Sequence, residues 1–164
     1  MVENETGACN ATFCATLVDE WVRNGLTDSV VCPGSRSTPM AVALAADGRV
    51  RVHVHHDERS GSFMALGLSR ATGRATLALC TSGTAAVEFH PAVVEADLDR
   101  VPLLVVTADR PPRLRGVGAP QTIDQVELYG SAVRSFVDAP LPDASDSGTW
   151  RSLAKRVWWS TNGV

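Results

Sequence analysis

The sequence lacks the short motifs that identify several common enzyme classes. It contains no G-x-G-x-x-G fingerprint, no phosphate-binding loop signature and no G-x-S-x-G motif. Its 4 cysteines form no C-x-x-C pair, which argues against a zinc site and a disulfide framework. Dinucleotide binding, phosphate-loop chemistry and serine hydrolysis are therefore not expected.

Long apolar runs and an excess of charge are missing as well. No run approaches the length that spans a bilayer, and the acidic opening MVENETGACN lacks the apolar core of a signal peptide. The net charge of −3 gives no reason to expect nucleic acid as a partner. With 164 residues, 45% of them hydrophobic, the chain predicts a single cytoplasmic domain with reduced, mostly buried thiols.

Apolar periodicity predicts strands that alternate with helices. Strands are expected at residues 29–31, 49–55, 75–80, 101–107 and 133–137, with the most apolar run, 101–107, as a central strand. Helices are expected at about 10–24, 39–46, 57–73, 85–96 and 123–128, and a C-terminal helix at 149–163 follows a linker at 141–148. This order predicts a single three-layer α/β/α domain with a mainly parallel sheet, whose body covers about residues 8–140.

Local signals add detail to this prediction. Asn10 and Asp57 are expected to cap the first and third helices, and Phe63, Gly67 and Ala71 are expected on the packed face of the third. The C-terminal helix carries several apolar residues, which could pack against this domain or against further protein that follows it in the chain.

Parallel sheets bind ligands outside the carboxyl ends of their strands. The turns after Val31, His55 and Cys80 and the long loop after Thr107 all lie at that edge of the predicted sheet. Four segments therefore converge on one rim, which is the predicted site.

Glu58 is the sharpest single candidate on this rim. It lies in the first turn of a predicted helix, where an acidic side chain also favours the helix dipole, so helix capping is the alternative interpretation. His53 and His55 precede it, but no further ligand group follows at a recognisable spacing, and no metal site is assigned.

Two arginines lie in turns on the same rim. Arg36 and Arg110 suit a carboxylate, because a guanidinium donates two parallel hydrogen bonds, whereas a salt bridge to Asp109 is the structural alternative. Ser35 and Ser82 could supply hydroxyl groups or only cap turns. Arg113 and Arg115 are expected to face solvent.

Six segments together resemble the N-terminal, pyrimidine-binding domain of thiamine-diphosphate enzymes, in the branch that acts in menaquinone biosynthesis. No segment is decisive alone, but PGSRST with TADRPP separates this branch from the others. The segments are CPGSRSTP (residues 32–39), HDERSGSFMALGLS (56–69), CTSGTA (80–85), PAVVEA (91–96), VPLLVVTADRPP (101–112) and GVGAPQTIDQ (116–125).

The resemblance implies a role for each candidate residue. Glu58 matches a catalytic glutamate that hydrogen-bonds the cofactor's aminopyrimidine and favours the imino tautomer, which removes the thiazolium C2 proton. Pro33, Ser82 and Gly83 match positions near the cofactor. The substrate-side positions are Ser35, Arg36, Arg110 and Gln121. Pro120 departs from the Asn expected before that glutamine, and proline offers neither an N–H group nor a polar side chain.

The resemblance also implies partners. The expected activity is transfer of a succinyl group from decarboxylated 2-oxoglutarate to isochorismate, with thiamine diphosphate and Mg²⁺. Both cofactors are held mainly by a C-terminal domain absent from this chain, usually that of a partner subunit in a dimer, so the chain is expected to be inactive alone. The alternatives are a pyrimidine-binding subunit of another thiamine-diphosphate decarboxylase and a non-catalytic carboxylate- or partner-binding module with Trp158 and Trp159 as an interface.

Overall fold

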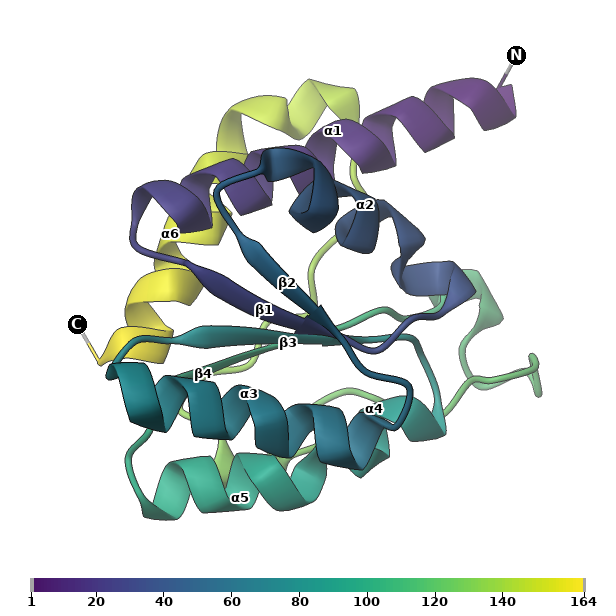
Figure 1. Ribbon diagram of the computed structural model, residues 1–164. Helices are drawn as coiled ribbons and strands as arrows, with labels where there is room; N and C mark the ends of the chain where they lie inside the picture. Colours follow the sequence, from purple (N-terminus) through teal and green to yellow (C-terminus); the bar gives the residue numbers. More distant parts are fainter. Residues whose placement is uncertain (1, 164) are drawn as a thin grey trace.

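The computed structural model describes residues 2–163, with side chains from residue 6 onward. A four-stranded parallel sheet in the order β2-β1-β3-β4 separates two layers of helices (Figure 1). The predicted α/β/α architecture is confirmed. The helices and strands are α1 (Val2–Arg23), β1 (Asp28–Val31), α2 (Thr38–Asp47), β2 (Arg51–Val54), α3 (Glu58–Thr72), β3 (Thr76–Cys80), α4 (Thr84–Glu88), α5 (His90–Leu98), β4 (Leu103–Thr107) and α6 (Trp150–Asn162), with 3-10 helices η1 (Ser35–Ser37), η2 (Pro112–Leu114), η3 (Gly130–Ala132) and η4 (Ala144–Thr149).

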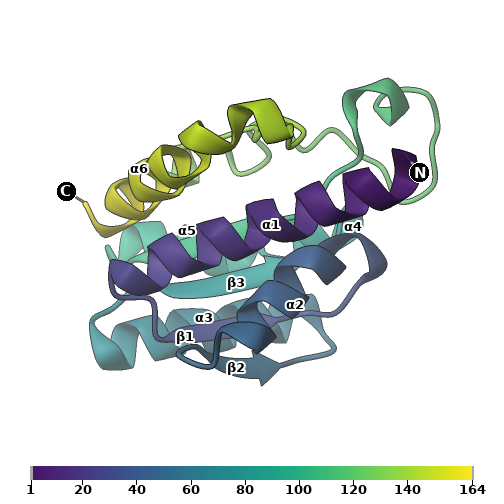
Figure 2. The ribbon, with the colours of Figure 1, turned by 90° about the horizontal axis from the view of Figure 1, so that it is seen from above.

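The two central strands are buried on both faces, because helices cover both. Val31, Leu77 and Leu79 pack with α1, α2 and α6, whereas Val30 and Ala78 pack with α3 and α4. Successive side chains of a strand point to opposite faces, so each strand serves two cores. Figure 2 looks onto the face that α1, α2 and α6 cover.

The strand register aligns the carboxyl ends of the strands at one edge. Val31 of β1 lies opposite both Val54 of β2 and Leu79 of β3, and Cys80 lies opposite Thr107 of β4. The turns after the four strands therefore leave the sheet from a common edge, as the sequence predicts.

Several predicted helix boundaries are wrong. The first helix begins at Val2, so Asn10 lies within it and is not its cap. The helix expected at 85–96 is interrupted at Phe89, because Pro91 lies in the first turn of a separate helix, α5. Residues 123–125 are irregular and residues 126–128 form a turn, so no helix is present there.

Helix α3 has the predicted cap but a different packed face. The Asp57 side chain accepts a hydrogen bond from the Ser60 N–H group, at 2.7 Å. The buried face carries small residues such as Gly61, where an added Cβ would lie 2.7 Å from Cys32 Sγ. The helix can approach the sheet only along that face, so the expected packed residues, Phe63, Gly67 and Ala71, are exposed.

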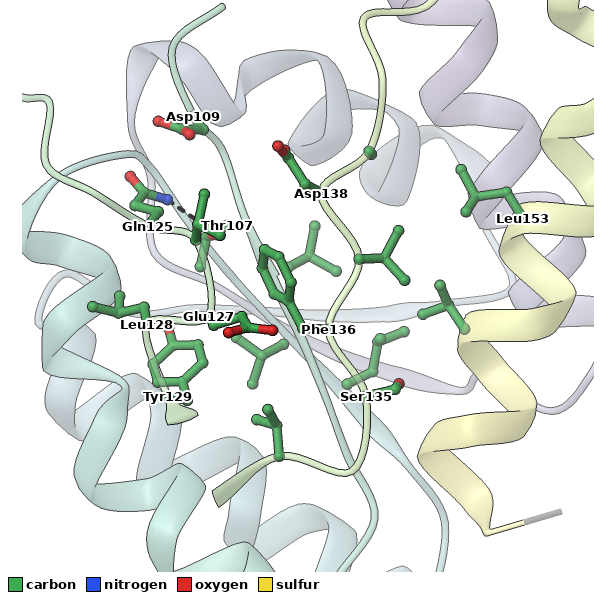
Figure 3. Close-up of a pocket in the computed structure, with 18 of the residues that line it drawn as sticks. Thr107, Asp109, Gln125, Glu127, Leu128, Tyr129, Ser135, Phe136, Asp138 and Leu153 are labelled. Carbon is green, nitrogen blue, oxygen red and sulfur yellow. Dashed lines mark hydrogen bonds between the residues drawn. The ribbon is translucent and has the colours of Figure 1, made fainter. Parts of the chain in front are cut away.

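Strand β4 is an edge strand of this sheet and not the predicted central one. The segment at 133–137, predicted as a strand, belongs to no strand ladder. A cavity of about 930 Å³ separates it from the open edge of β4. In Figure 3, Phe136 lies on this segment and Asp138 directly follows it, Leu153 comes from α6, and Gln125 and Thr107 meet at one end of the cavity.

The C-terminal helix docks on the domain. Trp150, Ala154 and Trp158 of α6 are buried in the core that α1 shares. The Trp21 indole N–H group donates a hydrogen bond to the Ala154 carbonyl oxygen, at 3.0 Å. The interpretation of Trp158 as an interface residue is therefore wrong, whereas Trp159 is 44% exposed. No helix within the described residues is long and apolar enough to span a membrane.

The neighbouring tryptophans of α6 test this packing. Trp158→Ala should lower the free energy of unfolding by about 3–5 kcal/mol, because it removes a buried aromatic side chain and leaves a cavity. Trp159→Ala should cost less than about 1 kcal/mol, since its ring is partly exposed and gains only a cation–π contact from Lys155. Urea unfolding followed by circular dichroism measures both, and equal losses would contradict the docking of α6.

Candidate functional site

The turn after β3, residues 81–83, lies on the rim at the carboxyl edge of the sheet. Gly83 has φ of 86° and ψ of −143°, a conformation that only glycine adopts without strain. The turn after β1 packs directly against it, because a Cβ added at Gly34 would lie 2.4 Å from Thr81 Cβ. The two turns that hold the candidate small residues and hydroxyl groups are thus in contact.

The two candidate arginines converge on one backbone oxygen. Arg36 Nη2 donates to the Pro120 carbonyl oxygen at 3.3 Å, and Arg110 Nη2 donates to the same oxygen at 2.9 Å. The Thr122 hydroxyl is a third donor to it, at 3.2 Å. Segments that follow β1 and β4 are therefore joined through the long loop.

Neither arginine is neutralised by an acidic side chain among the described residues. The predicted alternative, an ion pair between Asp109 and a rim arginine, is wrong, since Asp109 pairs with Arg115 at 3.0 Å. The Nε atoms of Arg36 and Arg110 are buried and have no hydrogen-bond partner within residues 2–163. Two cationic groups with unmet donors make this part of the rim suitable for an anion.

Arg115 is also held more firmly than expected. It forms a second ion pair with Asp138, at 2.8 Å, and is not turned to solvent as the sequence suggested. Its hydrogen bonds lower the pKa of Asp138 below the ordinary value. Arg113, by contrast, is exposed.

Ser82 and Gln121 connect the loop to the turn after β3. The Ser82 hydroxyl donates to the Gln121 carbonyl oxygen at 2.8 Å and accepts a hydrogen bond from Arg36 Nη1 at 3.1 Å. The Gln121 amide donates back to the Ser82 carbonyl oxygen, at 3.2 Å. The structure therefore brings Arg36, Ser82, Gly83, Arg110 and Gln121 together.

Gln125 is a site residue to which sequence reasoning gave no role. Its Oε1 accepts a hydrogen bond from the Gly83 N–H group at 2.9 Å, and its Nε2 donates to the Ala108 carbonyl oxygen at 3.1 Å. It also reaches the Thr107 hydroxyl, so it joins the ends of β3 and β4 (Figure 3). Its one available signal was its place at the end of the motif GVGAPQTIDQ.

Glu58 lies apart from the arginines, at the first turn of α3. Its carboxylate is half-buried and has no hydrogen-bond or ion-pair partner among the described residues. Burial raises the pKa of the Cys32 thiol to about 12, and the nearby Glu58 carboxylate adds to the rise. Burial also raises the pKa of the Cys80 thiol, and the Glu58 carboxylate again adds to the rise. The Glu58 charge therefore lies near the ends of β1 and β3. The capping role belongs to Asp57, which leaves the Glu58 carboxylate available.

Pro33 and Ser35 are exposed on the turn after β1, and neither side chain has a hydrogen bond to Arg36 or Arg110 among the described residues.

The histidine His53 on β2 is held by a carboxylate of β1. Its Nε2 lies 3.0 Å from Asp28 Oδ1. Burial of Asp28 is outweighed by the hydrogen bonds from His53 and Thr27, and its pKa is lowered. His53 is thus engaged by a carboxylate and is turned away from the rim residues described above.

This arrangement defines the class of protein. Residues 11–128 match the family model described as the thiamine pyrophosphate enzyme, N-terminal TPP binding domain. Since that match covers most of the chain, the chain belongs to this family, which binds thiamine diphosphate.

Three relatives of this chain share one enzyme name. The chain is 59% identical over 151 residues to 2-succinyl-5-enolpyruvyl-6-hydroxy-3-cyclohexene-1-carboxylate synthase of Thermobifida fusca, covering 91% of this chain and 27% of the relative. Relatives of the same name from Bacillus velezensis and Chloroflexus aurantiacus are 54% and 57% identical over 131 residues, 80% of this chain and 23% and 22% of theirs. The chain thus spans about a quarter of their length.

The contact between the two turns can be tested with alanine. Gly34→Ala should lower the free energy of unfolding by about 2–3 kcal/mol, because its Cβ would overlap the Thr81 side chain. Gly67→Ala, in the open interior of α3, should instead stabilise the chain by about 0.5–1 kcal/mol. Thermal unfolding of both variants measures the two signs, and a neutral Gly34→Ala would refute the close approach.

Proposed function

We propose that this chain is the pyrimidine-binding part of a thiamine-diphosphate-dependent synthase of menaquinone biosynthesis. The reaction would transfer a succinyl group from decarboxylated 2-oxoglutarate to isochorismate. The observation that carries the proposal is the half-buried, unpartnered Glu58 carboxylate at the carboxyl edge of a sheet of this family. The names of the relatives support this branch of the family.

The residues present fit the aminopyrimidine ring of thiamine diphosphate. Glu58 has no hydrogen-bond or ion-pair partner among the described residues, so its carboxylate is available to form a hydrogen bond with a ring nitrogen. Gly83 and Pro33 lie on the two adjacent turns after β3 and β1, at the carboxyl edge of the sheet. When bound, the cofactor supplies the electron sink that decarboxylation requires.

The arginine pair fits the charge of the substrates. Both proposed substrates carry two carboxylates, and Arg36 and Arg110 have no acidic partner among the described residues. Ser35 lies on the turn beside Arg36, and Gln121 is hydrogen-bonded to Ser82, which Arg36 also contacts. We assign these four residues to substrate binding, with Glu58 on the cofactor side.

The rest of the site would come from elsewhere in a complete enzyme. Within residues 2–163, no three His, Cys, Asp or Glu side chains form a group that could hold a metal ion. We propose that the diphosphate and Mg²⁺ are held by a second domain that faces this rim, in a cytoplasmic homodimer. That domain would cover the rim and bury Glu58 further.

A hybrid enzyme tests the role of Glu58. In this hybrid, the chain replaces the matching 151-residue region of the Thermobifida fusca relative. Glu58→Gln should lower its rate of product formation at least about 100-fold, because an amide cannot share a proton as a carboxylate does. Product is measured with thiamine diphosphate, Mg²⁺ and both substrates.

Two controls sharpen this test. Glu88→Gln, on an exposed position of α4, should leave the hybrid's rate unchanged. The isolated chain should form no product under the same conditions. Full activity of the Glu58→Gln hybrid would overturn the proposed role of Glu58, and product from the chain alone would overturn the need for a second domain.

A further inference from the structure

The carbonyl oxygen of Pro120 is surrounded as an anionic ligand would be. It accepts hydrogen bonds from Arg36, Arg110 and Thr122, at 3.3, 2.9 and 3.2 Å. A neutral carbonyl has only two lone pairs, so three donors, two of them cationic, exceed what it satisfies well. Both arginine Nε atoms remain buried, with no hydrogen-bond partner in the described part of the chain.

The loop that carries Pro120 also carries Gln121, another residue assigned to substrate binding, and the Gln121 side chain is hydrogen-bonded within the chain. The Gln121 amide donates to the Ser82 carbonyl oxygen at 3.2 Å, and its backbone oxygen accepts from the Ser82 hydroxyl at 2.8 Å. Three of the four residues assigned to substrate binding are therefore occupied by contacts within the chain. A ligand that takes over these same donors must therefore displace the loop.

Several features allow this loop to move. Gly116 and Gly118 have φ of 70° and 73° and touch nothing at the Cβ position. Gln121 holds φ of 57°, a left-handed conformation that is strained for a non-glycine residue. Val117, at the tip, is 67% exposed. In Figure 1 the green loop after β4 projects from the carboxyl edge of the sheet and is covered by no helix.

We propose that the Pro120 carbonyl is an internal stand-in for a substrate carboxylate and that the segment at 116–122 is a displaceable cover over the arginine pair. The proposal rests on the proposed function, since it takes Arg36 and Arg110 as the carboxylate site. A carboxylate offers two charged oxygens, and hydrogen bonds between ionised groups are roughly twice as strong as neutral ones. The ligand therefore displaces Pro120, and its apparent affinity is reduced by the fraction of chains whose loop is closed.

Thr122 provides a variant that changes the Pro120 acceptor without touching the arginines. Its only hydrogen bond among the described residues is the local one from its hydroxyl to the Pro120 carbonyl oxygen, within the cover itself. Thr122→Val keeps the side chain's shape and leaves that oxygen with the two arginine donors alone, which its two lone pairs satisfy, so the cover should close more firmly and carboxylate binding should weaken roughly three- to tenfold. Thr149→Val, which removes a similar hydroxyl bond to Asp146 far from the rim, should leave the affinity unchanged.

The experiment is an NMR titration of the full ¹⁵N-labelled chain with sodium succinate, against sodium chloride at matched ionic strength. The Nε–H signals of Arg36 and Arg110 should shift, and backbone amides of residues 117–122 should move with the same midpoint. Arg36→Gln or Arg110→Gln should weaken binding at least tenfold, and Arg113→Gln should not. The Thr122→Val and Thr149→Val chains are titrated in parallel.

The outcomes separate this inference from the proposed function. If the arginine signals shift while the loop amides stay still and Thr122→Val binds as the unaltered chain does, the displaceable cover is overturned and the carboxylate site stands. If no arginine signal responds to succinate, both the carboxylate role of the arginines and the cover are overturned. The role of Glu58 in the hybrid enzyme is measured independently of either result.

Discussion

The turn after β3 is the constraint on which the rest of the site depends. Gly34 lies against Thr81 so closely that no Cβ fits between them. Ser82 receives a hydrogen bond from Arg36, and Gln125 accepts one from the Gly83 N–H group. Segments after β1 and β4 are thus placed by one turn of three residues, which is itself fixed by the parallel register of β3 with its two neighbours.

The rim carries opposite charges on two sides of that turn. Glu58 stands at the start of α3 without a partner among the described residues, and Arg36 and Arg110 stand on the other side without an acidic one. Keeping partly buried charges unpaired costs free energy, which is more typical of a binding site than of a stabilising network. The Pro120 carbonyl offsets part of that cost for the arginines, while nothing comparable covers Glu58.

The sequence predicts the α/β/α fold well because local signals determine where most of its strands and helices form. A β-branched run identified β1, a buried apolar run identified β3, alternation identified β2, and Asp57 capped α3 as expected. The sequence does not reveal that β4 is an edge strand or that residues 133–137 stay unpaired, since an apolar run does not say which neighbours it has. The convergence of Arg36 and Arg110 followed from the rim rule, but their common acceptor is a backbone oxygen, whose position no side-chain pattern encodes. Gln125 was missed because its partners come together only in the folded chain.

In the proposed function, Glu58 controls a proton of the cofactor. The rate of hydrogen–deuterium exchange at the thiazolium C2 position of thiamine diphosphate bound to the hybrid enzyme, followed by proton NMR after acid quenching, measures this role. Glu58→Gln should slow this exchange at least about 100-fold, while Arg36→Gln should leave it close to that of the unaltered hybrid. Equal exchange in the Glu58→Gln and unaltered hybrids would contradict this role of Glu58.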